Sequence, residues 1–480
     1  MRRLLLALAL LGAAAAPAQA AAPEDAVVVA VIDSALNPYH HDFDAVPGLP
    51  ADRPPHEWLP GFPDPSAFAS YEKLRLTRSA DPAQPVAPLH DADREKWADV
   101  PQSTREEPHL RWLPGTKVVG LLDFDGASGG HGTLNDHGTR VASVGVGRRH
   151  GTCPDCLLVF LDYGTAAEAE QAIEWALDQP WIDVVTNSYG FSLVQRDRLY
   201  SGSDTEAQRR ASERGQSVFF SSGNGQQNDY QVPNTTLFSS QEGPDWILTV
   251  GGVDPEGHDW SGTGKPADVA GPTTGYPSLG GSTAGGTGTF GGTSNATPVV
   301  AGTYARALGA ARARLAGPSR TQDAGVVARG GPVACAGCPL ADGVLTAVEL
   351  RRALLHGAVR TPQGVRVGAV PAPLPDRTPV APEEAKLMSQ GHGVLWGRAR
   401  DAEAEHARVA GQLDGTVAPP VRPAGEREWF VVDSWCRQQL WGTWRDGAWS
   451  GQALPAPDPL WPVRTALSAT CSELEPPVAP

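Results

Sequence analysis

Four short segments of the chain hold residue types that together can perform nucleophilic catalysis. Asp33 ends the apolar run of residues 26–32, where a carboxylate can be held rigidly beside a histidine. His137 begins a segment rich in small residues, Asn224 lies in a Gly-flanked turn, and Ser294 follows a Gly-Gly turn. An imidazole oriented by a carboxylate can take the proton of a serine hydroxyl, and an amide can donate a hydrogen bond to the oxyanion that then forms. Brought together by the fold, these four residue types could perform acyl transfer.

Each of these residues taken alone also has a simpler explanation. Asp33 could cap a turn, Asn224 is a good turn residue between two glycines, and Ser294 could be an ordinary helix N-cap. A second histidine, His131, stands six residues before His137. We prefer His137 because the small residues that follow it suit a helix packed closely under a site.

Apolar runs alternate with helical stretches along most of the chain. Continuous apolar runs of this length are typical of buried parallel strands, and they occur at residues 26–32, 117–122, 156–161, 182–186, 217–221 and 246–250. Residues 166–178 have the composition of a helix, and a further capped helix is predicted to begin near Thr346. Strand–helix alternation predicts a doubly wound, mostly parallel α/β sheet, whose strand carboxyl ends gather the catalytic groups.

Two of the segments resemble motifs of a known family. Residues 292–298 read GTSNATP and resemble the nucleophile motif of the subtilisin-like serine proteases, Gly-Thr-Ser-Met-Ala-Thr/Ser-Pro. Residues 137–142 read HGTRVA and resemble the histidine motif of the same family. The resemblance extends from about residue 26 to residue 411, and the order of the catalytic residues is that of subtilisin.

The resemblance implies a serine endopeptidase that works through an acyl-enzyme. Asp33, His137 and Ser294 would form its catalytic triad, and Asn224 would lie in its oxyanion hole. It also implies an extended peptide substrate between two segments that border the primary specificity pocket, namely Ser188, Tyr189 and Gly190, and Ser221, Ser222 and Gly223. A substrate that binds as an added strand is contacted mainly through its backbone, so we expect broad specificity. We also expect that no cofactor is required.

The chain departs from the family pattern at a few positions. Asn295 stands where the family has Met and Val299 where it has His, but neither change removes a proton-transfer group. A buried Asn295 needs a hydrogen-bond partner, for which the insertion at residues 44–116 is one candidate. Asp42 is a candidate calcium ligand, as in many relatives. We favour a site without the ion, because residues 148–156 replace the loop that supplies most of its other ligands.

The N-terminus predicts export. Arg2 and Arg3 precede the apolar run of residues 4–16, and small residues follow at positions 18–20. Residues 1–20 therefore read as a secretory signal peptide; the alternative, a membrane anchor, is disfavoured because the apolar run is too short. Removal of this segment leaves 37 basic and 54 acidic residues, a net charge of −17 that disfavours binding to nucleic acid or to anionic membranes.

The remainder divides into a peptidase domain and an extension. We place the peptidase domain at residues 21–411, interrupted at 44–116 by a Pro-rich stretch that reads as a long surface insertion. Residues 412–480 form a C-terminal extension that holds six of the fourteen tryptophans between residues 429 and 461, and whose pattern predicts a small β-rich module.

The six cysteines fit an oxidising compartment. Cys436 and Cys471 are plausible disulfide partners within the extension. The pairs Cys153/Cys156 and Cys335/Cys338 could form a four-thiolate zinc site, or disulfides within or between the pairs. We favour disulfides, because export exposes free thiols to oxidation.

Two other functions remain to be compared with a peptidase. The fold could be a catalytically silent scaffold that acts as an extracellular binding protein, although the complete set of four residues argues against it. A lipase or esterase could use the same serine, but the Gly-x-Ser-x-Gly nucleophile elbow is absent around Ser294.

Overall fold

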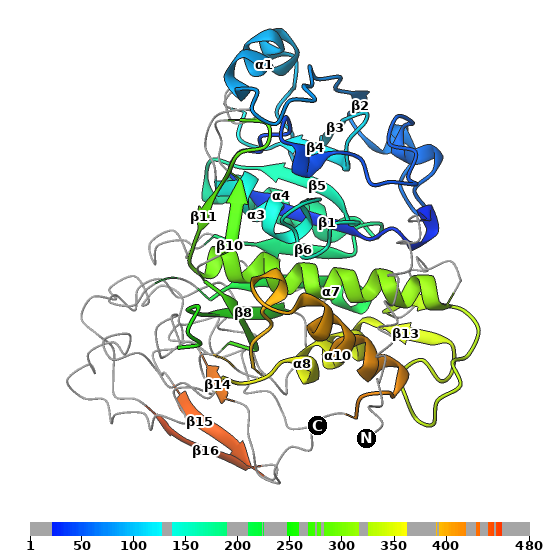
Figure 1. Cartoon of the computed structure of the whole chain (residues 1–480), viewed down its shortest axis with the longest axis vertical. Helices are drawn as coiled ribbons and strands as arrows, with labels where there is room; N and C mark the ends of the chain where they lie inside the picture. The colour runs from blue at the N-terminus through cyan, green and yellow to red at the C-terminus, as the bar shows by residue number, and fades with distance from the viewer. Residues whose placement is uncertain are drawn as a thin grey trace, which may run out of the picture.

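A twisted sheet runs through the centre of the molecule in the computed structural model (Figure 1). The structure describes residues 22–126, 137–189, 210–222, 224, 247–258, 267–273, 276–279, 283–315, 325–361, 390, 393–418, 429–432, 440–445 and 448–453. Over these residues the sheet has nine strands in the order β2-β3-β4-β5-β1-β6-β7-β8-β9. The strands are β1 (Val28–Asp33), β2 (Ser70–Lys73), β3 (His109–Trp112), β4 (Val118–Asp123), β5 (Leu157–Asp162), β6 (Val184–Asn187), β7 (Ser217–Ser221), β8 (Ile247–Val253) and β9 (Val269–Pro272).

All neighbouring strands of this sheet are parallel except β3 and β4. Each of the six apolar runs predicted as a strand forms one, and helices lie on both faces of the sheet. The predicted doubly wound α/β fold is therefore confirmed.

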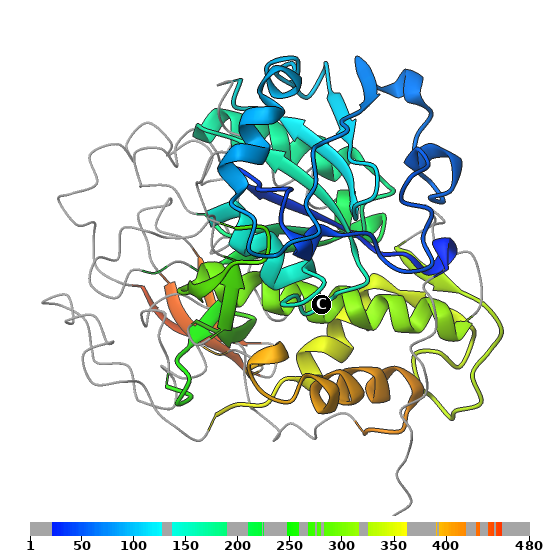
Figure 2. The same ribbon diagram turned by 45° about the horizontal axis from the view of Figure 1, so that its top comes forward.

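The described residues form five longer helices beside the sheet. They are α3 (His137–Val146), α4 (Ala166–Asp178), α7 (Thr293–Leu315), α8 (Ala347–Gly357) and α10 (Ala402–Asp414), with α8 and α10 packed against α7 (Figures 1 and 2). The helix predicted at residues 166–178 forms with those bounds, and a capping box between Thr165 and Glu168 fixes its start. Thr346 caps α8 in the same way through Glu349.

The two faces of the sheet bury separate apolar cores. Val29 and Val31 of β1 point into a core shared with α3, α7, α8 and α10. The alternating residues Ala30 and Ile32 point into the other core, which α4 covers. Because both faces of β1 are buried, its sequence has no polar alternation until the strand ends at Asp33.

The Pro-rich segment 44–116 is more than a surface loop. It contributes β2 and β3 to one edge of the sheet, together with α1 (Val86–Ala92) and α2 (Arg94–Ala98). Its aromatic side chains pack inward: Trp97 and Trp112 are both buried, and the ring of Phe62 lies 4.4 Å from that of Trp181. The insertion thus completes the core at this edge.

The remaining elements are short. They are the hairpins β10 (Tyr276–Leu279) with β11 (Thr287–Phe290) and β12 (Val326–Arg329) with β13 (Val344–Thr346), the antiparallel sheet β14 (Trp429–Val432), β15 (Leu440–Arg445) and β16 (Ala448–Ala453), and the 3-10 turns η1 (Pro23–Asp25), η2 (His41–Phe43), η3 (Pro55–Glu57), η4 (Pro65–Ala67) and η5 (Gly397–Ala399). No helix in the described parts is long and apolar enough to cross a membrane. The predicted signal peptide at residues 1–20 lies outside the described residues.

Both CxxC pairs form disulfides within the pair, Cys153 with Cys156 and Cys335 with Cys338. This selects one of the alternatives left open by the sequence. Cys436 and Cys471 lie outside the described residues, so their pairing remains a prediction.

Candidate active site

Asp33 and His137 meet at the carboxyl edge of the sheet. The His137 Nδ1 atom lies 2.7 Å from the Asp33 Oδ1 atom, and Asp33 is almost fully buried while His137 is partly exposed. The backbone N–H of Ser34 donates to the same Asp33 oxygen at 2.8 Å. The Phe290 ring packs against the imidazole in a T-shaped arrangement, with ring centres 5.4 Å apart. A histidine whose Nδ1–H donates to a buried carboxylate presents Nε2 as a base. The alternative histidine, His131, lies outside the described residues.

Small residues allow α3 to lie close under this edge. A Cβ atom on Gly138 would lie 2.4 Å from the carbonyl oxygen of Ser34, so only glycine fits there. A Cβ on Gly145 would already contact Pro298 of α7 at 3.4 Å. His137 and Ser294, at the starts of α3 and α7, are thus carried by two helices that pack against each other.

Ser294 lies in the first turn of α7 and makes a reciprocal pair with Ser188. The Ser294 hydroxyl donates to the Ser188 carbonyl at 3.0 Å, and the Ser188 hydroxyl donates to the Ser294 carbonyl at 3.1 Å. Pro298, four residues along the helix, has no N–H to offer that carbonyl. The proline therefore frees the Ser294 carbonyl for Ser188, which ties the start of α7 to the segment after β6.

Asn224 is held beside Ser294 by the residue that precedes the serine. The Thr293 backbone N–H and hydroxyl both donate to Asn224 Oδ1 at 2.8 Å. With its oxygen engaged, the amide presents Nδ2 as a donor from an exposed side chain. Gly292 has a φ of +76°, and a Cβ there would lie 2.8 Å from both Nδ2 and Oδ1 of Asn224. The sequence motif thus serves the amide as well as the serine, which the sequence did not reveal.

The segments expected to border the substrate lie side by side in part. Strands β6 and β7 pair Asn187 with Phe220, and the Ser221 hydroxyl lies 3.4 Å from the Tyr189 carbonyl that it faces. Ser188 and Ser222 are buried. The other two predicted residues of these segments, Gly190 and Gly223, lie outside the described residues.

Three neighbouring strands end in aspartate at the same level. Asp33 of β1 pairs in register with Asp162 of β5, which pairs with Asp123 of β4. Burial raises the pKa of Asp123 to about 6 and holds the pKa of Asp162 well above its usual range. The sequence carries the signal for this row, because the apolar runs VVAVID, VVGLLD and LLVFLD all end in Asp, although the family motifs point only to the first of them, Asp33.

The hydrogen-bond partner of the Asn295 amide lies outside the insertion at residues 44–116. The buried amide Nδ2 donates to the carbonyl of Pro272 at the end of β9, at 2.7 Å, and not to the insertion. Val299, the second departure from the family pattern, is fully buried in an apolar contact with Val144 of α3. Asn295 thus joins α7 to β9 through its Nδ2 atom, and Val299 packs α7 against α3.

The surroundings of Asp42 do not fit a calcium ion. Its buried carboxylate accepts hydrogen bonds from the Ser143 hydroxyl at 2.7 Å, the Arg149 backbone N–H at 2.7 Å and His150 Nδ1 at 2.8 Å. Burial opposes ionisation of Asp42, but the interactions with His150, Ser143 and Arg149 together outweigh it and lower the carboxyl pKa. Calcium requires a shell of oxygen acceptors, whereas these three groups are donors.

A buried lysine holds the other end of α3. The Lys117 side chain is fully buried, and its Nζ donates to the carbonyl of Val146 and, at 2.6 Å, to that of Pro154. Burial lowers the pKa of Lys117 to about 7. Lys117 thus connects the last residue of α3 to the disulfide loop between Cys153 and Cys156.

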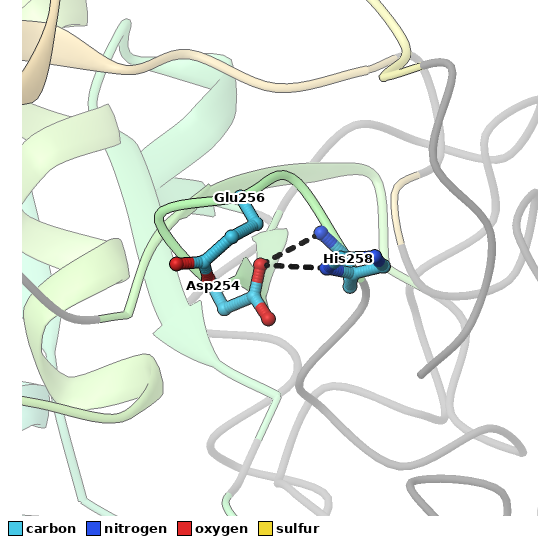
Figure 3. A group of neighbouring side chains, drawn as sticks. All are labelled: Asp254, Glu256 and His258. Carbon is cyan, nitrogen blue, oxygen red and sulfur yellow. Dashed lines mark hydrogen bonds and ion pairs between the residues drawn. The ribbon is translucent and has the colours of Figure 1, made fainter. Parts of the chain in front are cut away.

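One group of metal-ligand side chains occurs elsewhere among the described residues. Atoms of Asp254, Glu256 and His258 come within 4.8 Å of one another on the turn after β8 (Figure 3). Asp254 Oδ1 accepts from the His258 backbone N–H at 2.8 Å and lies 3.3 Å from His258 Nδ1, as the dashed lines show. Arg400 donates to the Pro255 carbonyl at 2.7 Å, which places a cation beside the turn. These hydrogen bonds close the turn, and the closed turn explains why the three side chains lie close together.

Comparison with known proteins identifies the family of this domain. A sequence model described as the subtilase family matches residues 24–327. No curated protein matches the chain.

Solved structures of proteases resemble the chain at low identity. The prenylagaramide maturation protease PagA is 15% identical, with 82% of this chain and 95% of that chain covered and a TM-score of 0.42. The patellamide maturation protease PatG is 15% identical, with 82% and 93% covered and a TM-score of 0.41. A cold-adapted subtilisin-like serine proteinase is 19% identical, with 59% and 75% covered and a TM-score of 0.34.

Proposed function

The chain belongs to the subtilase family of serine-type peptidases, and on that premise we propose that it is an exported endopeptidase whose triad is Asp33, His137 and Ser294. The observation that carries the proposal is the 2.7 Å contact between His137 Nδ1 and the buried Asp33 carboxylate. A histidine with a purely structural role does not need a buried carboxylate to orient its ring, whereas a general base does.

The mechanism follows from the positions of these groups. His137 Nε2 takes the proton as the Ser294 hydroxyl, turned away from its resting bond to Ser188, attacks the scissile carbonyl. Asp33 keeps the imidazole in the required tautomer and stabilises its protonated form. His137 then gives the proton to the leaving amine, and water releases the acyl group from Ser294 by the same steps in reverse order.

The oxyanion is stabilised from two directions. Asn224 Nδ2 is oriented by the two bonds that Thr293 makes to the amide oxygen. The backbone N–H of Ser294, in the first turn of α7, adds a second donor where the helix dipole also favours negative charge. Every group that the reaction uses is supplied by the chain, so we propose that no cofactor is required.

The substrate binds in this proposal as an extended strand between residues 188–190 and 221–223. The contact between Ser221 and the Tyr189 carbonyl supports two adjoining walls of one pocket. Backbone pairing of this kind favours proteins or peptides of varied sequence as substrates. Export rests on the sequence of residues 1–20, and two disulfides within the described residues are compatible with an oxidising compartment.

The test compares three alanine variants with the wild type. Ser294→Ala should remain folded and lose both casein hydrolysis and labelling by a fluorophosphonate probe, since the probe reacts only with an activated serine. His137→Ala should lose both as well, whereas His131→Ala, the matched control, should keep most of the activity. A short ester substrate assayed beside casein distinguishes an esterase from a peptidase.

The alternative is a catalytically silent scaffold that acts as an extracellular binding protein. A wild-type protein that is folded but neither labelled nor active would support it. Undiminished labelling of Ser294→Ala would show that a different residue is the nucleophile.

A further inference from the structure

The backbone turn that follows Asp33 is held in an unusual conformation. Ala35 has a φ of +53°, and it is the one non-glycine residue with positive φ among the described residues. An L-residue is less stable in this region than in its ordinary conformations, because its Cβ crowds the backbone. The turn therefore needs contacts from its surroundings that keep it in place.

Asp162 supplies such a contact from the neighbouring strand. The Ala35 backbone N–H donates to Asp162 Oδ1 at 2.8 Å, and the bond is fully buried. Because Asp162 pairs in register with Asp33, its carboxyl group leaves β5 at the level at which the chain leaves β1. The third aspartate of the row differs, because Asp123 Oδ1 accepts from the N–H groups of Asp125 and Gly126 in the turn after its own strand.

The same turn also holds the start of α3. The Ser34 carbonyl accepts from the Gly138 backbone N–H at 3.1 Å, and the Asn37 backbone N–H donates to the Thr139 hydroxyl at 2.8 Å. Gly138 follows His137 directly, and a Cβ at that position would overlap the Ser34 carbonyl. A movement of the turn would thus displace the imidazole as well as the carboxylate.

We propose that Asp162 is a positioning residue for Asp33 and His137: its carboxyl group fixes the turn at Ala35, on which the contact between carboxylate and imidazole depends. The inference rests on the proposed triad, since it assigns a residue that supports the same site. Asp162 makes no contact with substrate in this role and acts only through the turn.

The hydrogen bond from Ala35 to Asp162 does not require a charged carboxylate. Burial holds the pKa of Asp162 well above the usual range, and the negative charges of Asp123, Asp125 and Asp33 act in the same direction. Tyr163, the next residue, is partly buried, and desolvation raises the pKa of its phenol, so it is neutral. A neutral acid can still accept from Ala35 through its carbonyl oxygen, and it adds no charge to the environment of the imidazole.

Three variants of the full-length protein test the proposal. Asp162→Ala removes the acceptor for Ala35, Asp162→Asn keeps a neutral acceptor of the same shape, and Asp123→Ala removes the neighbouring carboxylate that accepts from the turn after its own strand. For each we would measure kcat, KM, the pH profile of kcat/KM, and the thermal melt. The downfield proton resonance of the His137–Asp33 hydrogen bond is recorded as well, because it requires no turnover.

Asp162→Ala should lower kcat by about 10²-fold with little change in KM, because a displacement near 1 Å at a reacting pair has an effect of this size. Its downfield resonance should be lost or shifted. Asp162→Asn and Asp123→Ala should stay within about threefold of wild-type kcat and keep the resonance. The acid limb of the Asp162→Asn profile should coincide with that of the wild type.

Several results would overturn the proposal. One is an Asp162→Ala variant with near-wild-type kcat and an unchanged resonance, and another is an Asp123→Ala variant that loses as much activity. If Asp162→Asn lowered kcat as much as Asp162→Ala does, positioning through the side-chain oxygen that accepts from Ala35 would be excluded. An acid limb moved to lower pH in Asp162→Asn would show that a charged Asp162 acts on the imidazole directly. If the wild type lacks both activity and labelling at Ser294, the proposed function fails, and the resonance alone still decides the role of Asp162.

Discussion

Replacement of Asn224 by two different residues separates its role in orientation from its role in catalysis. Asn224→Ala removes both the Nδ2 donor and the Oδ1 acceptor that binds Thr293. Asn224→Asp removes only the donor, since a carboxylate can accept the same two bonds at the same place. The two variants therefore share a catalytic defect and differ in stability.

The magnitudes follow from these contacts. Loss of one oxyanion donor lowers kcat by about 10²–10³-fold, which corresponds to about 3–4 kcal/mol of transition-state stabilisation. KM should change little, because the ground-state carbonyl binds the donor far more weakly than the oxyanion does. Thr293 is buried, so its N–H and hydroxyl lose their acceptor in Asn224→Ala, at a cost of about 1–3 kcal/mol in the free energy of unfolding.

Steady-state kinetics and thermal melts on the two purified variants provide the assay. We expect both to lose kcat, with Asn224→Asp at least as impaired because its charge repels the oxyanion, and only Asn224→Ala to melt at a lower temperature. If Asn224→Asp retained kcat within about tenfold of the wild type, the amide would not bind the oxyanion. A lower melting temperature with normal kcat in Asn224→Ala would reduce Asn224 to a turn residue.

Three further predictions concern the glycine turn, the buried lysine and the extension. Gly292→Ala should lower kcat at least about tenfold, because the new Cβ would lie 2.8 Å from the Asn224 amide and displace it, and kinetics alone checks this. Burial lowers the pKa of Lys117 from 10.5 to about 7, so Lys117 binds fewer protons in the folded protein than in the unfolded one, and the free energy of unfolding should rise with pH between about 7 and 10.5. Urea unfolding in a catalytically inactive background checks this: the free energy of unfolding of the Lys117 protein minus that of its Lys117→Met variant should increase from about pH 6.5 to pH 9.5. Non-reducing peptide mapping should find Cys436 joined to Cys471, a loop closure worth about 3–4 kcal/mol in the chain-entropy model, and alkylation of both thiols without reductant would exclude it.

The strands and the helix starts could be read from the sequence because their signals are local. The apolar run before Asp33 forms β1 because both of its faces are buried, and Thr346 with Glu349 forms the capping box that opens α8. The edge strand β2 could not be recognised in the same way. Its sequence SYEK is half exposed and carries no apolar run, so the charged composition of the insertion concealed it.

The contacts of the site were less predictable, because they join residues far apart in the chain. Thr293 and Asn224 are 69 residues apart, and Asp162 and Ala35 are 127 apart. Nothing in the local pattern around Asn224 indicates that Thr293 binds its oxygen. For Asp162 a signal did exist in the repeated Asp at the ends of apolar runs, but its meaning depends on the strand order that places β5 beside β1.

The way the insertion packs limits how the chain can be engineered. A Pro-rich stretch of this kind looks dispensable in the sequence. Removal of the insertion would take away Phe62, which packs on Trp181, and Trp97, whose indole N–H donates to the Tyr39 hydroxyl at 2.8 Å. The freshly uncovered aromatic surface and the open edge of β4 would both invite aggregation. A minimal version of this enzyme must therefore retain the insertion, or replace its buried side with an equally apolar cover.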